Sequence, residues 1–303
     1  MTTCSAASRA AREPLAGTAA TARTWLLIEQ PGPWGAKALT GSRLDPALGR
    51  DLEHAAEGTG VRVALIRRPG RHADPGGPVR RRVFAVHTAP GRGWVRTAVL
   101  DEPGPLRALG LAALGAGHHE GLWQEHRGAP LVLVCTNGRR DRCCALLGRP
   151  LATELAGVAG SDVWEISHLG GHRFAPTLLV LPHGYTYGRM SAPAVKNLLA
   201  EARGGRMVTE GCRGRSTWDR FGQTADLALR ELLGEAGADA LDVTGGRPVP
   251  GGRLTTLLHT DGRAWRVLVT EQTTGPALPA SCGDAPLPRA RLHAAEITPL
   301  APR

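Results

Sequence analysis

The chain has 303 residues, of which 42% are hydrophobic, and this composition predicts a globular protein with a substantial buried core. Its formal net charge is +10, but only 4% of its residues are aromatic and no basic run alternates with aromatic residues, which argues against a nucleic-acid-binding surface. No run reaches the roughly 18 apolar residues of a membrane span, and residues 1–23 lack the apolar centre of a signal peptide, so we expect a cytoplasmic protein without a membrane partner.

The first part of the chain shows an alternation of strand and helix signals. Apolar β-branched runs predict strands, and apolar residues at helical spacing predict helices. These signals predict strands at 24–29, 61–66, 82–87 and 94–100 and helices at 46–57 and 106–114. A loop rich in Pro, Gly and Arg is expected at 68–79, and the residues before 24 are expected to form a loose arm. The predicted element order is βαβββα.

The second part repeats this order after a connection at 115–130. Strands are predicted at 131–134, 163–167, 177–181 and 185–190, with helices at 145–155 and 192–202. This order is that of thioredoxin, so we predict an α/β (α+β) fold with two thioredoxin-like βαβββα modules in tandem. Pro176 stands where thioredoxin-like folds place a cis-proline.

The last third of the chain predicts a small α+β appendage. A loop at 211–215 precedes an amphipathic helix at 217–234, and Asp261-Gly262 indicates a hairpin between strands at 253–260 and 263–270. One more strand is expected at 291–297. The expected domains are an N-terminal module without ligands at 1–115, a module with the candidate site at 116–204, and the appendage at 205–303.

Cysteines and histidines cluster in the second predicted module. Cys135 follows the apolar run 131–134, and Cys143 and Cys144 open the next helix. His168 and His172 flank two glycines, which break a helix and place both histidines in a loop. Thiolates and imidazoles are the ligands of zinc and of iron–sulfur clusters, so the pattern predicts a metal site. The remaining cysteines are isolated in sequence and are expected to be bystanders: Cys4, Cys212 and Cys282.

The same stretch resembles a known family. Cys135 to Cys144, the run His168-Leu-Gly-Gly-His172, and the downstream Leu181-Pro-His-Gly184 are similar to the sucrase/ferredoxin-like family. The resemblance implies a thioredoxin-like ferredoxin domain that binds a [2Fe–2S] cluster with two cysteines and two histidines. Carried over by position, the implied ligands are Cys135, Cys144, His168 and His172, with Cys143 as the alternative to Cys144.

These ligands predict a one-electron carrier or redox sensor. Its partner would be a reductase or an acceptor protein with an acidic surface, because a basic chain attracts acidic partners over long distances. The alternative is a structural zinc site in a protein with a non-redox interaction role, since zinc takes the same ligands. A sugar-hydrolysing enzyme is not predicted, because the acidic residues form no pair that could flank a glycosidic bond, and no catalytic residue is assigned.

Overall fold

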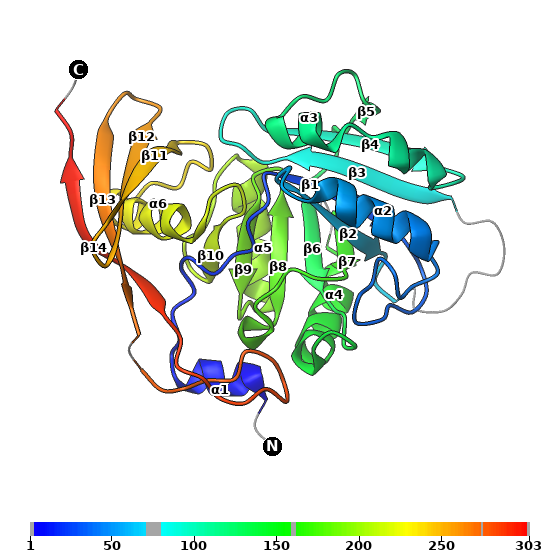
Figure 1. The fold of residues 1–303 in the computed structure, drawn as a ribbon, viewed down its shortest axis with the longest axis horizontal. Coiled ribbons are helices and arrows are strands. Elements are labelled where there is room, and N and C mark those ends of the chain that lie inside the picture. Colours follow the sequence, from blue (N-terminus) through cyan, green and yellow to red (C-terminus); the bar gives the residue numbers. More distant parts are fainter. Residues whose placement is uncertain (1–2, 71–79, 159–161, 274, 302–303) are drawn as a thin grey trace.

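The computed structural model describes residues 3–70, 80–158, 162–273 and 275–301, and most of the loop expected at 68–79 lies outside these ranges. Figure 1 shows a large mixed sheet with helices on its faces and a second, smaller sheet that carries the C-terminus. The mixed α+β class is therefore confirmed. None of the described helices is both long and apolar enough to cross a membrane.

The large sheet has ten strands in the order β10-β9-β8-β6-β7-β2-β1-β3-β4-β5. The first part of the chain contributes α1 (Cys4–Ala10), β1 (Thr24–Glu29), α2 (Pro46–Ala56), β2 (Val61–Arg67), β3 (Arg81–His87), β4 (Trp94–Leu100), η1 (Gly104–Ala108), α3 (Leu111–Ala116) and β5 (Gln124–Glu125). The second part contributes β6 (Leu131–Cys135), η2 (Cys144–Gly148), α4 (Arg149–Leu155), β7 (Asp162–Ile166), η3 (His172–Phe174), β8 (Thr177–Leu181), β9 (Tyr185–Gly188), α5 (Ala192–Arg203) and β10 (Cys212–Arg215).

The two halves of this sheet share one strand order. The first half runs β2-β1-β3-β4 and the second runs β7-β6-β8-β9, and in each half the first two strands are parallel and the others antiparallel. The halves meet where β2 pairs antiparallel with β7. In this pairing Ile66 lies opposite Ile166, and Arg67 lies opposite Glu165. The predicted repeat of elements is thus present, while the assignment of each half to the thioredoxin fold stays a prediction.

Alternate residues of the strands enter different cores. On β1, Leu26 and Ile28 pack with the residues of α2 and α3, whereas Trp25 and Leu27 face a core shared with the second half. Leu133 and Cys135 of β6 reach the same shared core. Each of these apolar side chains is fully removed from water, a burial that contributes about 1.5–3 kcal/mol for a leucine or isoleucine. The end of β6 therefore lies in a dry, closely packed position.

The appendage is a four-stranded antiparallel sheet covered by one helix. It consists of α6 (Arg220–Leu233), β11 (Leu241–Val249), β12 (Gly252–His259), β13 (Ala264–Gln272) and β14 (Arg291–Pro299). The apolar face of α6 packs through Ala225 and Leu229 onto Leu257 and Val267. Asp219 caps this helix by accepting a hydrogen bond from the Gly222 N–H at 2.9 Å. The hairpin predicted at Asp261-Gly262 is present between β12 and β13.

Several local predictions differ from the structure. The arm expected before residue 24 contains α1, the loop expected at 211–215 contains β10, and β11 was not predicted. The helix expected at 106–114 is two short helices, η1 and α3, because Leu109 is extended and Gly110 is not helical. The helix expected at 145–155 begins as the π-helical turn η2, which runs directly into α4 with Pro150 in the first turn of α4. At Pro176, by contrast, the structure agrees with the expectation, since the Ala175–Pro176 peptide bond is cis.

Candidate metal centre

Cys135 and Cys144 are brought together at the end of the central strand β6. The chain leaves β6 through a turn in which the Arg140 and Asp141 N–H groups donate to the Asn137 carbonyl at 3.2 Å. The π-helical turn η2 then returns to β6, where a Cβ atom on Gly148 would lie 2.1 Å from the Cys135 carbonyl oxygen. Only glycine permits this approach. It leaves the sulfur atoms of Cys135 and Cys144 3.6 Å apart, and both side chains are buried.

His168 and His172 are held by the loop that follows β7. Gly170 and Gly171 both have φ values in the left-handed region, +76° and +70°, so the chain reverses sharply between the two histidines. The imidazole rings stack with their centroids 5.0 Å apart and an interplanar angle of 30°. The buried Arg213 guanidinium donates to the Gly170 carbonyl at 3.1 Å, and this hydrogen bond fixes the loop.

The two pairs of side chains meet. His172 Nδ1 lies 3.4 Å from the Cys144 sulfur, and the His168 imidazole is near enough to Cys135 to lower the pKa of its thiol. His168 Nδ1 is buried and has no hydrogen-bond partner in the described part of the chain. A buried ring nitrogen is costly unless it is satisfied, and a metal ion would satisfy it. All four residues predicted to be ligands thus form one group, although a ligand role stays a prediction for each.

The electrostatics of this group favour the metal-binding forms of Cys135 and His172, but not that of Cys144. The hydrogen bond with Cys144, helped by His168, holds the pKa of Cys135 well below its usual range, and the same contact raises the pKa of Cys144. Burial and the neighbouring His168 lower the pKa of His172, which keeps this imidazole neutral. Thiolate and neutral imidazole are the ligating forms.

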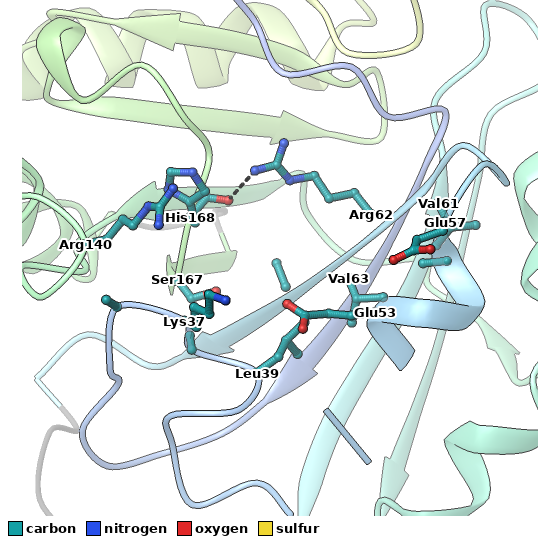
Figure 2. A pocket seen from close by; sticks show the side chains of 14 residues that line it. Lys37, Leu39, Glu53, Glu57, Val61, Arg62, Val63, Arg140, Ser167 and His168 are labelled. Carbon is teal, nitrogen blue, oxygen red and sulfur yellow. Dashed lines mark hydrogen bonds between the residues drawn. The ribbon is translucent and has the colours of Figure 1, made fainter. Parts of the chain in front are cut away.

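A cavity of about 410 Å³ opens beside His168. Figure 2 shows Arg62 and Arg140 beside His168, with the Arg62 guanidinium donating to the His168 carbonyl at 3.5 Å, and the carboxylates of Glu53 and Glu57 further along the wall. One edge of the group is therefore reached from the surface past arginine side chains, while Cys135 and Cys144 stay inside the shared core.

Cys143 belongs to a second group. Its sulfur lies 3.5 Å from that of Cys4 and 3.3 Å from that of Cys282. Together with Asp141 these residues could hold a metal ion, since one ligand atom from each lies within 4.8 Å of the others. Sequence reasoning missed this group by treating Cys4 and Cys282 as bystanders. The one available signal was the adjacent pair Cys143-Cys144, of which a single metal site readily uses only one.

Comparison with known proteins adds one finding. Residues 15–214 match the family described as sucrase/ferredoxin-like. No curated protein and no solved structure was found to match the chain. The matched region covers more than half of the 303 residues and contains all four residues of the first group. The chain therefore belongs to the sucrase/ferredoxin-like family.

Proposed function

We propose that this protein is a cytoplasmic one-electron carrier or redox sensor that binds one [2Fe–2S] cluster through Cys135, Cys144, His168 and His172. The observation that supports the proposal is the meeting of two thiols and two imidazoles from separate loops in a buried position, with contacts of 3.6 Å between the sulfurs and 3.4 Å between Cys144 and His172.

The spread of the four ligand atoms favours two irons over one zinc ion. The Cys135 and Cys144 sulfurs lie 3.6 Å apart and the two imidazole rings stack, so one iron can take the cysteines and the other the histidines; His172 Nδ1 also lies 3.4 Å from the Cys144 sulfur. A single tetrahedral zinc would need all four ligand atoms within about 4 Å of one another. Among the described residues, no three of these four side chains bring their ligand atoms within 4.8 Å of one another.

A bound [2Fe–2S] cluster supplies reversible transfer of one electron. The chain's own residues determine how that electron would enter and leave. The shared core excludes water from Cys135 and Cys144, while the cavity beside His168 offers an approach from the surface. Arg62, Arg140 and Lys37 line this approach, with Glu53 and Glu57 further from His168, so we propose a protein partner whose docking surface is acidic.

The test is anaerobic purification of the full chain from cells supplied with iron. We expect a reddish-brown protein that contains iron and acid-labile sulfide and whose visible absorption bleaches on addition of dithionite. The Cys135→Ser variant should be colourless, whereas Cys212→Ser, a buried cysteine outside both groups, should keep the colour. A colourless wild-type protein with zinc bound to two sulfurs and two nitrogens would instead establish the structural zinc alternative.

A further inference from the structure

We infer that the chain carries a second metal site, a structural zinc ion held by the thiolates of Cys4, Cys143 and Cys282 and by the carboxylate of Asp141. The three sulfur atoms form a nearly regular triangle with edges of 3.5 Å for Cys4 to Cys143, 3.3 Å for Cys143 to Cys282 and 3.6 Å for Cys282 to Cys4. This inference does not depend on the proposed [2Fe–2S] cluster.

The triangle fits one face of a tetrahedral zinc site. With Zn–S bonds of about 2.3 Å, neighbouring sulfurs in a tetrahedron lie about 3.8 Å apart, so the thiols need to spread by only a few tenths of an ångström. A disulfide explains the group less well. It would join two sulfurs at about 2 Å and leave the third thiol unused, whereas here all three lie at similar distances.

Asp141 supplies the fourth corner. Both of its carboxylate oxygens lie 3.8 Å from the Cys4 sulfur. The carboxylate is fixed by hydrogen bonds from the Cys143 N–H at 2.8 Å, the Cys282 N–H at 2.8 Å and the Ser281 hydroxyl at 2.5 Å. A carboxylate offers about four acceptor positions, so one remains for a metal. A carboxylate held against three thiols would repel their thiolate forms unless a cation lay between them.

The donor set and burial select the metal class. Cys4 and Cys143 are 1% exposed and Asp141 is 4% exposed, so the site is closed to water except at the partly exposed Cys282. Three thiolates and one carboxylate match the sulfur-rich, four-coordinate preference of zinc rather than the oxygen ligands of calcium or magnesium. Because all four corners come from the protein, the site has no open position for a substrate, which is the arrangement of a structural zinc.

The site joins parts of the chain that are remote in sequence. Cys4 begins α1, Asp141 and Cys143 lie in the turn after β6, and Cys282 lies between β13 and β14. In Figure 1 the segment after β13 descends to α1 and then returns as β14. The family match at 15–214 contains Asp141 and Cys143 but neither Cys4 nor Cys282, so the complete group is not a feature of the matched region.

A metal at this point would hold α1 against the segment that carries His172 of the first group. The helix α1 packs against η3, which carries His172. Two hydrogen bonds also join this N-terminal segment to the second half of the chain. The Glu13 carboxylate accepts from Arg173 at 2.8 Å, and the Ser8 carbonyl accepts from Arg189 at 3.1 Å. The zinc ion would hold the start of α1 and the C-terminal segment on the turn that also leads to Cys144.

The experiment measures zinc in the full-length protein after dialysis against a weak chelator. We expect about one zinc ion per chain, and X-ray absorption at the zinc edge should show three sulfur neighbours and one oxygen neighbour. The variants Cys282→Ser and Cys4→Ser should lose this zinc. The matched control Cys212→Ser should retain it, and circular dichroism should show that all three variants are folded.

Zinc with two sulfur and two nitrogen neighbours would place the ion at the first group and overturn the inference. So would a zinc content unchanged in both Cys282→Ser and Cys4→Ser. A disulfide between any two of the three cysteines, detected as a mass about 2 Da below that of the reduced chain after denaturation and alkylation, would also overturn it. If Cys4→Ser fails to fold, the partly exposed Cys282 still provides the test.

Discussion

Cys143 and Cys144 are adjacent in sequence, yet their thiols enter two different groups. The Cys144 sulfur lies 3.6 Å from Cys135, and the Cys143 sulfur lies 3.3 Å from Cys282. The divergence arises at the start of the helical segment, where successive side chains point about 100° apart around the axis. The turn after β6 therefore contributes one cysteine to each of the two groups.

This divergence gives the first prediction. Cys144→Ser should remove iron and visible absorption, because it takes one thiolate from the first group. Cys143→Ser should keep both, because its sulfur lies in the second group, and should lose zinc instead. The measurements are the visible spectrum and the metal content of the two variants purified side by side. Loss of colour in Cys143→Ser with retention in Cys144→Ser would reverse the assignment.

The second prediction concerns the two glycines between the histidines. Both have positive φ, so an alanine at either position costs about 1–2 kcal/mol. A Cβ atom on Gly170 meets nothing within 4 Å, but a Cβ atom on Gly171 would lie 2.2 Å from the Arg213 guanidinium. Gly171→Ala should therefore displace His172 and lower the iron content several-fold, whereas Gly170→Ala should lower only thermal stability.

Iron content and melting temperature of the two glycine variants separate these effects. Equal iron loss in both variants would mean that backbone conformation, and not the contact with Arg213, positions His172. Full iron retention in Gly171→Ala would show that the loop tolerates the displacement.

The third prediction concerns the joint between the two halves of the large sheet. Arg67 Nε donates to the Glu165 carboxylate at 2.8 Å, and both side chains are buried, at 3% and 1% exposure. The Thr136 hydroxyl donates to the same oxygen at 2.9 Å. Glu165→Gln would leave a buried guanidinium without its counter-charge, a change that costs about 3–5 kcal/mol. Urea unfolding monitored by tryptophan fluorescence measures this loss.

The control for the joint is an ion pair of the same chemistry at the surface. Arg80 and Asp101 lie 3.0 Å apart with side chains 70% and 80% exposed. Asp101→Asn should change the free energy of unfolding by no more than about 1 kcal/mol, because water screens exposed pairs. Similar losses in both variants would mean that the buried pair contributes nothing particular to the joint.

The sequence was sufficient for elements with strong local signals. The helix α2 begins at Pro46, and Asp45 before it accepts hydrogen bonds from two following N–H groups. This cap can be recognised from the sequence alone. The strand β11 was missed because Thr244, Gly245 and Gly246 interrupt its apolar pattern, and its pairing with β12 shifts register there. Its stability comes from cross-strand contacts that only the fold reveals.

The same distinction applies to the metal groups. The four residues of the first group lie in two short motifs, so local spacing and a family resemblance were enough to find them. The second group joins Cys4 to Cys143 across 139 residues and to Cys282 across 278 residues. No periodicity connects such positions, and their meeting depends on the path of the chain after β13.

The last prediction is a pH dependence that arises far from the metal groups. His87 on β3 is buried, its Nδ1 lies 2.8 Å from the Thr24 hydroxyl, and its ring stacks on Trp94. The Thr24 hydroxyl donates to the Leu114 carbonyl at 2.7 Å, so the ring must be the donor to Thr24. Burial, with the nearby Arg23, lowers the pKa of His87 from 6.5 to about 4.

The sign of the effect follows from the two pKa values. Between pH 6.5 and 4 the unfolded chain binds a proton at this imidazole that the folded chain excludes, so the free energy of unfolding falls as the pH is lowered. The loss amounts to at most about 3 kcal/mol. In His87→Gln this part of the dependence disappears, and the gap in unfolding free energy between wild type and variant should shrink from pH 7 to pH 4. Because carboxylates titrate equally in wild type and variant, a constant gap for His87→Gln would mean that the buried ring accepts its proton without cost.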